Sequence, residues 1–312
     1  MPDQPPIRPS NGPQWERVTV PNCGWGAAPF WHPQQDRLYW LDQAQDRIWR
    51  LHLSSGHGEL WQLAQTPGSI APCRSGALLM ALRDGIHLSA EWRDITQLIA
   101  AAPQDAPGQR FDEGRCDPWG RFWVGTRADD GTRADDGTRA DGALYCLHKR
   151  DRPHPELLRL GGGVISSGGL AWSADGRTLY WGDSARGRIE TRALLRGGQH
   201  PPVLGPAQSF ARFPPGQARG AAVDRLGNYW IALADGACVQ CLSPRGDLLV
   251  SLPTPALRPT ALCFGGHDLR SLFLTTARAG LDPAALARYP DSGAVFALRV
   301  DTPGLPVTPY ED

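Results

Sequence analysis

The sequence is marked first by what it lacks. No apolar run in the 312 residues approaches the length of about 18 that suggests a membrane-spanning helix. Lysine is very scarce, and Lys+Arg and Asp+Glu both number 32, so the formal net charge is zero. Nucleic-acid binders normally show a basic excess or a basic stripe, and this chain has no such excess. We therefore expect neither a membrane nor a nucleic acid as a partner.

Two further absences bear on location. The N-terminus, "MPDQPPIRPSNGP", has no basic patch followed by an apolar core, so no secretory signal is expected. We expect residues 1–15 to form a flexible, proline-rich arm and residues 16–312 to form a single domain. The seven cysteines are odd in number and scattered along the chain, which argues against a disulfide framework. A cytoplasmic location is the expectation.

Turn-forming and aromatic residues are abundant instead. Gly 36 and Pro 29 together make up about a fifth of the chain, and Trp reaches 12. Such a composition favours short strands joined by many turns over long helices. One short helix is expected at "DPAALARY", near Asp282.

A strand–turn–strand pattern recurs along the chain. It appears as "DRLYWLDQAQDRIWRLHL", "GALLMALRDGIHLSA", "GRFWVGT" with "GALYCLHKR", "GRTLYWGDSARGRIETRAL", "GNYWIALADGACVQCLSP", and "SLFLTTARA" with "SGAVFALRV". These six units are spaced roughly 40 to 55 residues apart, the range expected of four-stranded propeller blades. The sequence therefore predicts an all-β fold, a six-bladed β-propeller; the even spacing argues against a pair of β-sandwiches. Chemistry in such a fold is expected at the central channel, just before the first strong strand of each unit.

Three motifs carry a resemblance to a known family. The segments "RFDEGRCDPWGRFWVGT", "GLAWSADGRTLYWGDS" and "LCFGGHDLRSLFLTTAR" resemble the regucalcin (senescence marker protein)/gluconolactonase family, and the similarity covers roughly residues 16–310. The resemblance implies a six-bladed propeller that hydrolyses sugar lactones with one divalent cation in its channel.

The metal ligands of that family are replaced in this chain. The family's Glu-Gly-Pro stretch matches "GAAPFWHP", which places Ala27 at the glutamate. Its Ser-Asn-Gly-Leu motif matches "SSGGLAW", with Gly168 at the asparagine, and its Pro-Asp-Gly motif matches "QARGAAVD", with Arg219 at the aspartate. Calcium and magnesium need several oxygen ligands, which alanine and glycine side chains do not supply. We expect no metal and no other cofactor, with the charge of Arg219 taking the place of the cation.

Charged residues remain in the family's Arg-Phe-Asn-Asp-Gly motif, where this chain has Arg110, Asp112 and Glu113. The resemblance implies that Arg110 contacts substrate. Asp112 and Glu113 are candidate general acids or bases, and Arg219 is a candidate for stabilising the oxyanion. The alternative is structural: Arg219 or Arg110 forms an internal ion-pair cluster with the two carboxylates. Loss of the larger ligand side chains at Ala27 and Gly168 would widen the substrate pocket.

Other candidates have simpler explanations. His32, in the turn "FWHPQQDR", is a candidate substrate contact but is more typical of a turn residue. Asp42 and Asp183 occupy the same strand-end position in two units, which favours a turn-capping role. The tryptophans Trp40, Trp123, Trp181 and Trp230 lie within strand patterns and are expected in the core.

A hexad repeat, "GTRADDGTRADDGTRADG", lies between two expected strands of the third unit. Of its carboxylates, Asp129 and Asp130 best match a family loop that can reach substrate, so Asp130 is a candidate substrate-binding residue. The interleaved arginines offset the acidic charge, and no EF-hand spacing is present. A solvated loop is the favoured interpretation, with a ligand-capping lid as the alternative.

Three functions stay open at this point. The first is a lactone or ester hydrolase that works without the family's cation on a small molecule in the channel. The second is a non-catalytic propeller that binds a small molecule, and the third is an interaction scaffold that uses the outer loops.

Overall fold

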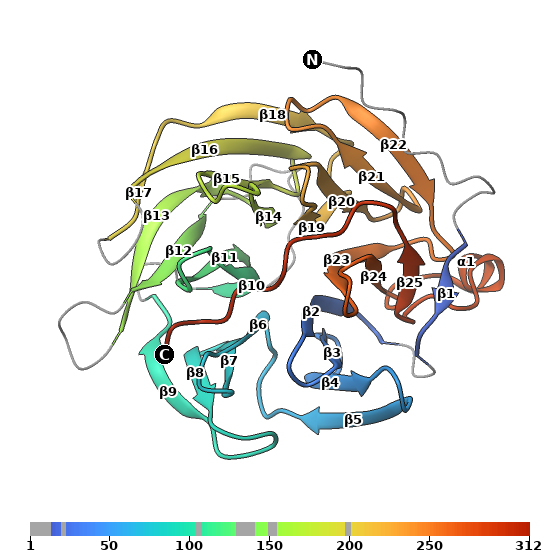
Figure 1. Cartoon of the computed structure of the whole chain (residues 1–312), viewed down its shortest axis with the longest axis horizontal. Helices are drawn as coiled ribbons and strands as arrows, with labels where there is room; N and C mark the ends of the chain where they lie inside the picture. The colour runs from blue at the N-terminus through green and yellow to red at the C-terminus, as the bar shows by residue number, and fades with distance from the viewer. Residues whose placement is uncertain (1–13, 20–22, 104–107, 129–140, 149–154, 197–200) are drawn as a thin grey trace.

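The computed structural model describes residues 14–19, 23–103, 108–128, 141–148, 155–196 and 201–312. Their strands form six antiparallel sheets arranged in a ring around a common centre (Figure 1). The predicted six-bladed β-propeller is thereby confirmed. Within the described part of the chain, no helix has the length and apolar character needed to cross a bilayer.

The first three blades follow the chain from its N-terminal side. Blade 1 contains β2 (Gly26–His32), β3 (Arg37–Asp42), β4 (Arg47–His52) and β5 (His57–Gln62). Blade 2 contains β6 (Ser69–Pro72), β7 (Leu78–Leu82), β8 (Gly85–Ser89) and β9 (Gln97–Ala101). Blade 3 contains β10 (Gln109–Cys116), β11 (Phe122–Ala128), β12 (Gly142–His148) and β13 (Glu156–Val164).

The remaining blades complete the ring. Blade 4 contains β14 (Ser167–Trp172), β15 (Thr178–Asp183), β16 (Arg188–Arg196), β17 (Val203–Leu204) and β18 (Gln208–Arg212). Blade 5 contains β19 (Ala218–Val223), β20 (Tyr229–Leu233), β21 (Cys238–Leu242) and β22 (Leu248–Pro253). Blade 6 contains β23 (Pro259–Gly265), β24 (Ser271–Thr276), β25 (Phe296–Arg299) and the N-terminal β1 (Glu16–Arg17).

The ring is closed by its two chain ends. Strand β1 pairs antiparallel with β25, so the last blade takes its outer strand from the start of the chain. This exchange leaves no clear mark in the sequence, because a strand of two residues is too short to show an alternating pattern. Between β24 and β25 lies the expected helix, α1 (Pro283–Arg288), whose N-cap Asp282 accepts a hydrogen bond from the Ala285 amide at 2.7 Å.

Apolar side chains pack between the blades. The described residues form six buried clusters, one at each contact between neighbouring blades. The four tryptophans expected in the core are all at most 3% exposed: Trp40, Trp123, Trp181 and Trp230. Each blade is covered on both faces by its neighbours in the ring, so its strands carry apolar residues on both sides. The repetition of such strands from blade to blade made the sequence pattern clear.

The C-terminal segment 301–312 crosses the ring on the face where the first and second strands of each blade are joined (Figure 1). The Leu305 amide donates to the Val223 carbonyl, and the Tyr310 amide donates to the Pro72 carbonyl at 2.8 Å. Tyr310 itself is buried between blades 2 and 3. This segment therefore closes one mouth of the channel.

Candidate active site

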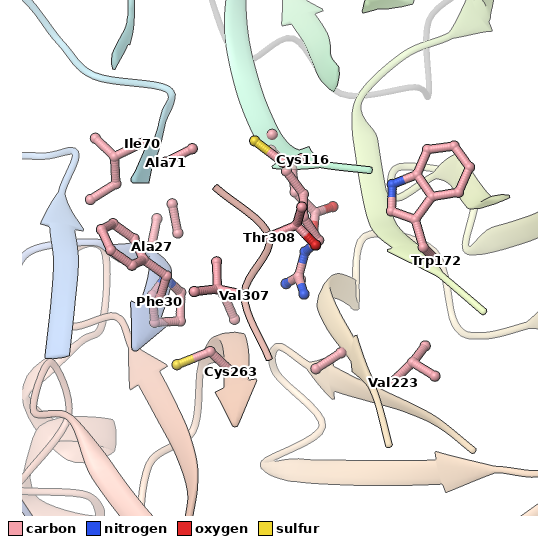
Figure 2. Close-up of a pocket in the computed structure, with 18 of the residues that line it drawn as sticks. Ala27, Phe30, Ile70, Ala71, Cys116, Trp172, Val223, Cys263, Val307 and Thr308 are labelled. Atoms are coloured by element: carbon pink, nitrogen blue, oxygen red, sulfur yellow. The ribbon is translucent and has the colours of Figure 1, made fainter. Parts of the chain in front are cut away.

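The centre of the ring holds a cavity of about 290 Å³. All six inner strands contribute to its wall, and residues 305–308 of the C-terminal segment form its floor (Figure 2). Apolar side chains such as Phe30, Ile70 and Val307 line it together with charged ones. Among the described residues, the charged lining consists of Asp112, Glu113, Arg115, Arg127 and Arg219.

Irregularities in the inner strands turn extra residues toward this cavity. Five of the six inner strands shift register against the second strand of their blade. In β2 the shift contains Ala28, which has a φ of 46°, and in β14 it contains Gly169, with a φ of 71°. A bulge bends its strand and re-aims the neighbouring side chains, which is how a β-strand presents consecutive residues to one site.

The three positions that the resemblance assigns to metal ligands all line the cavity, but they do not fit a divalent cation. Ala27 offers no side-chain oxygen, and Arg219 brings a positive charge. At Gly168 a Cβ atom would lie 2.9 Å from the Cβ of Ser184, so a larger side chain would require Ser184 to move. The described residues include no group of three or more His, Cys, Asp or Glu side chains that could hold a metal ion.

Asp112 lies in the bulge of β10 and faces an arginine. Its carboxylate is 3.4 Å from Nε of Arg127, and both side chains are about one-fifth exposed, at 18% and 20%. The structural alternative named Arg219 or Arg110 as the partner; the structure places Arg127 there instead. Arg127 is the first arginine of the hexad repeat and was assigned to a solvated loop, yet it still belongs to β11.

Glu113 is the most perturbed carboxyl group of the cavity. Burial raises its pKa from 4.5 to about 7, and the nearby Asp112 charge adds to the effect. The Leu170 amide, which donates to Oε2 at 2.9 Å, and the Arg115 guanidinium oppose the rise. Both protonation states of Glu113 are therefore populated near neutral pH, as suits a general acid or base.

Arg219 lies near the start of β19, with its guanidinium carbon 5.4 Å from the centre of the Trp25 ring. Burial lowers its pKa, and the charge of Asp112 opposes that effect. No carboxylate in the described part of the chain lies within ion-pair distance of it. Trp25 is held in turn by Asp42, which accepts a hydrogen bond from its amide at 3.1 Å.

Arg115 was not singled out from the sequence. Its side chain leaves β10 in blade 3 and reaches across the channel, where Nη2 donates to the Ala221 carbonyl of β19 at 2.7 Å. A longer contact of 3.5 Å reaches the Leu262 carbonyl of β23. Only the closed ring places blades 3, 5 and 6 around this guanidinium, so no local sequence pattern could have indicated it.

The other candidates lie elsewhere. Arg110 lines a separate hollow of about 20 Å³ rather than the central cavity. His32 ends β2 at 7% exposure, with its ring beside Tyr39 and its pKa lowered by burial, and it does not belong to the cavity lining. Asp129 and Asp130 lie outside the described residues.

The two strand-end aspartates have the turn-capping role that the sequence predicted. Asp42 accepts hydrogen bonds from the amides of Gly24 and Ala44 at 3.0 and 3.2 Å. Asp183 accepts from the amides of Ile165 and Ala185, both at 3.1 Å. Each aspartate thus ties the start of its inner strand to the turn after the second strand, which fixes the segments that line the cavity.

Comparison with known proteins agrees with this architecture. Residues 25–278 match the family model described as "SMP-30/Gluconolactonase/LRE-like region". A Pseudomonas putida protein named 6-deoxy-6-sulfogluconolactonase is 35% identical over 288 residues, covering 89% of this chain and 92% of its own. Regucalcin from Gallus gallus is 28% identical over 292 residues, covering 91% and 94%.

A solved structure gives the same result for the fold. The calcium-binding protein regucalcin from Agrobacterium tumefaciens superposes with a TM-score of 0.87 at 23% identity, covering 96% of this chain and 98% of its own. The family model spans most of the chain, and the motifs of blades 3 and 4 lie within it. The chain therefore belongs to the SMP-30/gluconolactonase/LRE-like family.

Proposed function

We propose that this protein hydrolyses a lactone in its central cavity, and that it does so without a divalent cation. The observation that carries the proposal is the presence of Glu113, with a pKa of about 7, in the same cavity as Arg219, which has no carboxylate partner among the described residues. A hydrolytic metal ion activates the attacking water and stabilises charge on the carbonyl oxygen. A base that titrates near neutral pH can take the first role, and a cation that faces the reacting group can take the second. The name of the P. putida relative supports a lactone as the substrate class.

The reaction needs three groups in this arrangement. A water molecule attacks the lactone carbonyl carbon while the ionised carboxylate of Glu113 takes its proton. The guanidinium of Arg219 stabilises the negative charge that develops on the carbonyl oxygen. The bond from the carbonyl carbon to the ring oxygen then breaks, and protonated Glu113 returns the proton to that oxygen. The product is an open-chain hydroxy acid, and Glu113 is again a carboxylate, ready for another cycle.

Asp112 has a supporting role and is the second candidate for the base. Its carboxylate is held by Arg127, and its charge lies beside Glu113 in the chain. A negative neighbour makes Glu113 harder to ionise, so Asp112 helps to hold the pKa of Glu113 near 7. Removing that charge would lower the pKa of Glu113 and move the pH profile of the reaction to lower pH.

The compartment belongs to the same proposal. All seven cysteines are free thiols, and most of them are buried. Unpaired cysteines are typical of proteins kept in a reducing compartment, which favours the cytoplasm.

A panel of sugar and aliphatic lactones, followed by acid release at constant pH, tests the proposal. The wild type should hydrolyse at least one of them, with kcat/KM rising as Glu113 ionises through a pH of about 7. Glu113→Gln and Arg219→Met should each lose activity, while the surface variant Arg212→Met should match the wild type. Absence of turnover across the panel would instead favour a non-catalytic binding protein, and an active Glu113→Gln variant would transfer the role of base to Asp112.

A further inference from the structure

Among the described residues that line the cavity, arginines outnumber carboxylates. Arg115, Arg127 and Arg219 line it, against Asp112 and Glu113. Asp112 is already engaged with Arg127. Two guanidinium groups, on Arg115 and Arg219, thus lack a carboxylate within ion-pair distance in the described part of the chain.

Arg115 is placed to bind a ligand, because its guanidinium is anchored on one side only. Its Nη2 donates to the carbonyls of Ala221 and Leu262, on strands across the channel from its own. Backbone carbonyls orient a guanidinium but carry no full negative charge. A cation in a partly buried site costs free energy unless an anion compensates it, and a guanidinium forms paired hydrogen bonds to carboxylate, sulfonate or phosphate oxygens.

The two unpaired arginines lie in different parts of one cavity. Arg219 lies near the start of β19, beside Trp25, whereas Arg115 lies near the end of β10, two residues after Glu113, and contacts Ala221. A ligand that spans Glu113 would meet one cation at each of its ends.

We propose that the substrate is a lactone that carries an additional anionic group remote from its carbonyl, and that Arg115 binds this group while Arg219 faces the lactone carbonyl. Arg115 then determines specificity, because a neutral lactone would leave its guanidinium uncompensated. This inference rests on the proposed lactonase function for the placement of the carbonyl.

Binding of an analogue that cannot be hydrolysed tests the inference separately from catalysis. Isothermal titration calorimetry would compare a hexitol that bears a terminal sulfonate with the unmodified hexitol. The wild type should bind the sulfonated compound at least about tenfold more tightly, the low end of what a hydrogen bond to a charged group contributes. Arg115→Met keeps most of the side-chain stem and should lose this preference, whereas the exposed control Arg212→Met should keep it.

Each outcome has a defined meaning. Equal binding of the two hexitols by the wild type, or an unchanged preference in Arg115→Met, would overturn the inference and leave Arg115 as a cross-link between blades. If circular dichroism shows that Arg115→Met does not fold, Arg115→Lys keeps the cation without the paired geometry. It should show a weaker preference for the sulfonate, and an unchanged preference would contradict the inference.

Failure of the proposed function would look different. A protein that prefers the sulfonated hexitol but hydrolyses no lactone, neutral or anionic, would retain the anion site and lose the catalytic proposal. A protein that hydrolyses neutral and anionic lactones with equal kcat/KM would retain the catalytic proposal and lose the anion site.

Discussion

Replacing Glu113 by glutamine should abolish hydrolysis and at the same time stabilise the protein in alkaline solution. The carboxyl group has a pKa of about 7 in the folded protein, against 4.5 as the reference for an unfolded chain. Glutamine has nearly the same shape and can still accept the hydrogen bond from the Leu170 amide. The variant therefore removes the cost of a buried charge while it keeps the local packing.

The sign of the effect follows from proton binding. Between pH 4.5 and 7 the folded state holds a proton on Glu113 that the unfolded state has released, so wild-type stability falls as pH rises through this window. Above pH 7 Glu113 is ionised in both states, and the full free-energy cost of its buried charge lowers the stability of the folded protein. At about 1.36 kcal/mol per pKa unit, the difference between 4.5 and about 7 amounts to about 3 kcal/mol at pH 8 and below about 1 kcal/mol at pH 5.

Urea unfolding at pH 5 and pH 8 measures this difference. Glu113→Gln should gain about 3 kcal/mol over the wild type at pH 8, and most of that gain should vanish at pH 5. Glu59→Gln serves as a contrast, because Arg50 and Arg37 lower the pKa of Glu59 to about 2 and its replacement should destabilise at both pH values. The reasoning is refuted if Glu113→Gln is no more stable than the wild type at pH 8, or if its advantage does not shrink at pH 5.

Three other substitutions test the site and its support. Arg219→Met should lower kcat by about 10²- to 10³-fold, as loss of an oxyanion-stabilising donor does, with little change in unfolding free energy. A loss of activity that is matched by a loss of folding stability would contradict a catalytic role. Gly168→Ala should destabilise by about 1–3 kcal/mol in urea unfolding because its Cβ meets Ser184, and the double variant with Ser184→Gly should recover most of the loss. Tyr310→Ala, at the end of the segment that closes the channel, should cost about 3 kcal/mol of unfolding free energy, and a neutral result would show that this segment is not anchored there.

The fold could be predicted from the sequence because its signal is repeated. Strands that alternate around Trp40, Trp123 and Trp230 recur at blade spacing, so six weak local patterns reinforce one another. Ala27, Gly168 and Arg219 line the cavity because the motifs that mark them lie at the starts of inner strands.

The charge pairing could not be predicted in the same way. Arg127 pairs with Asp112 across a bulge between β10 and β11, and a bulge changes which residues face the channel without a clear sequence mark. Arg115 contacts blades that lie more than a hundred residues further along the chain. The resemblance made Arg110 a substrate contact, and His32 was a candidate contact although a turn residue was favoured; neither lines the central cavity, and Arg110 lines a separate hollow.

Hydrolysis after metal removal tests the central claim most directly. The purified protein would be dialysed against EDTA, its metal content measured by mass spectrometry, and its turnover of the best lactone of the panel compared with that of untreated protein. We predict the same rate before and after removal, and no further increase on adding Ca²⁺, Mn²⁺ or Zn²⁺. Loss of activity with EDTA and recovery with one of these ions would contradict the assignment of the cation's role to Arg219.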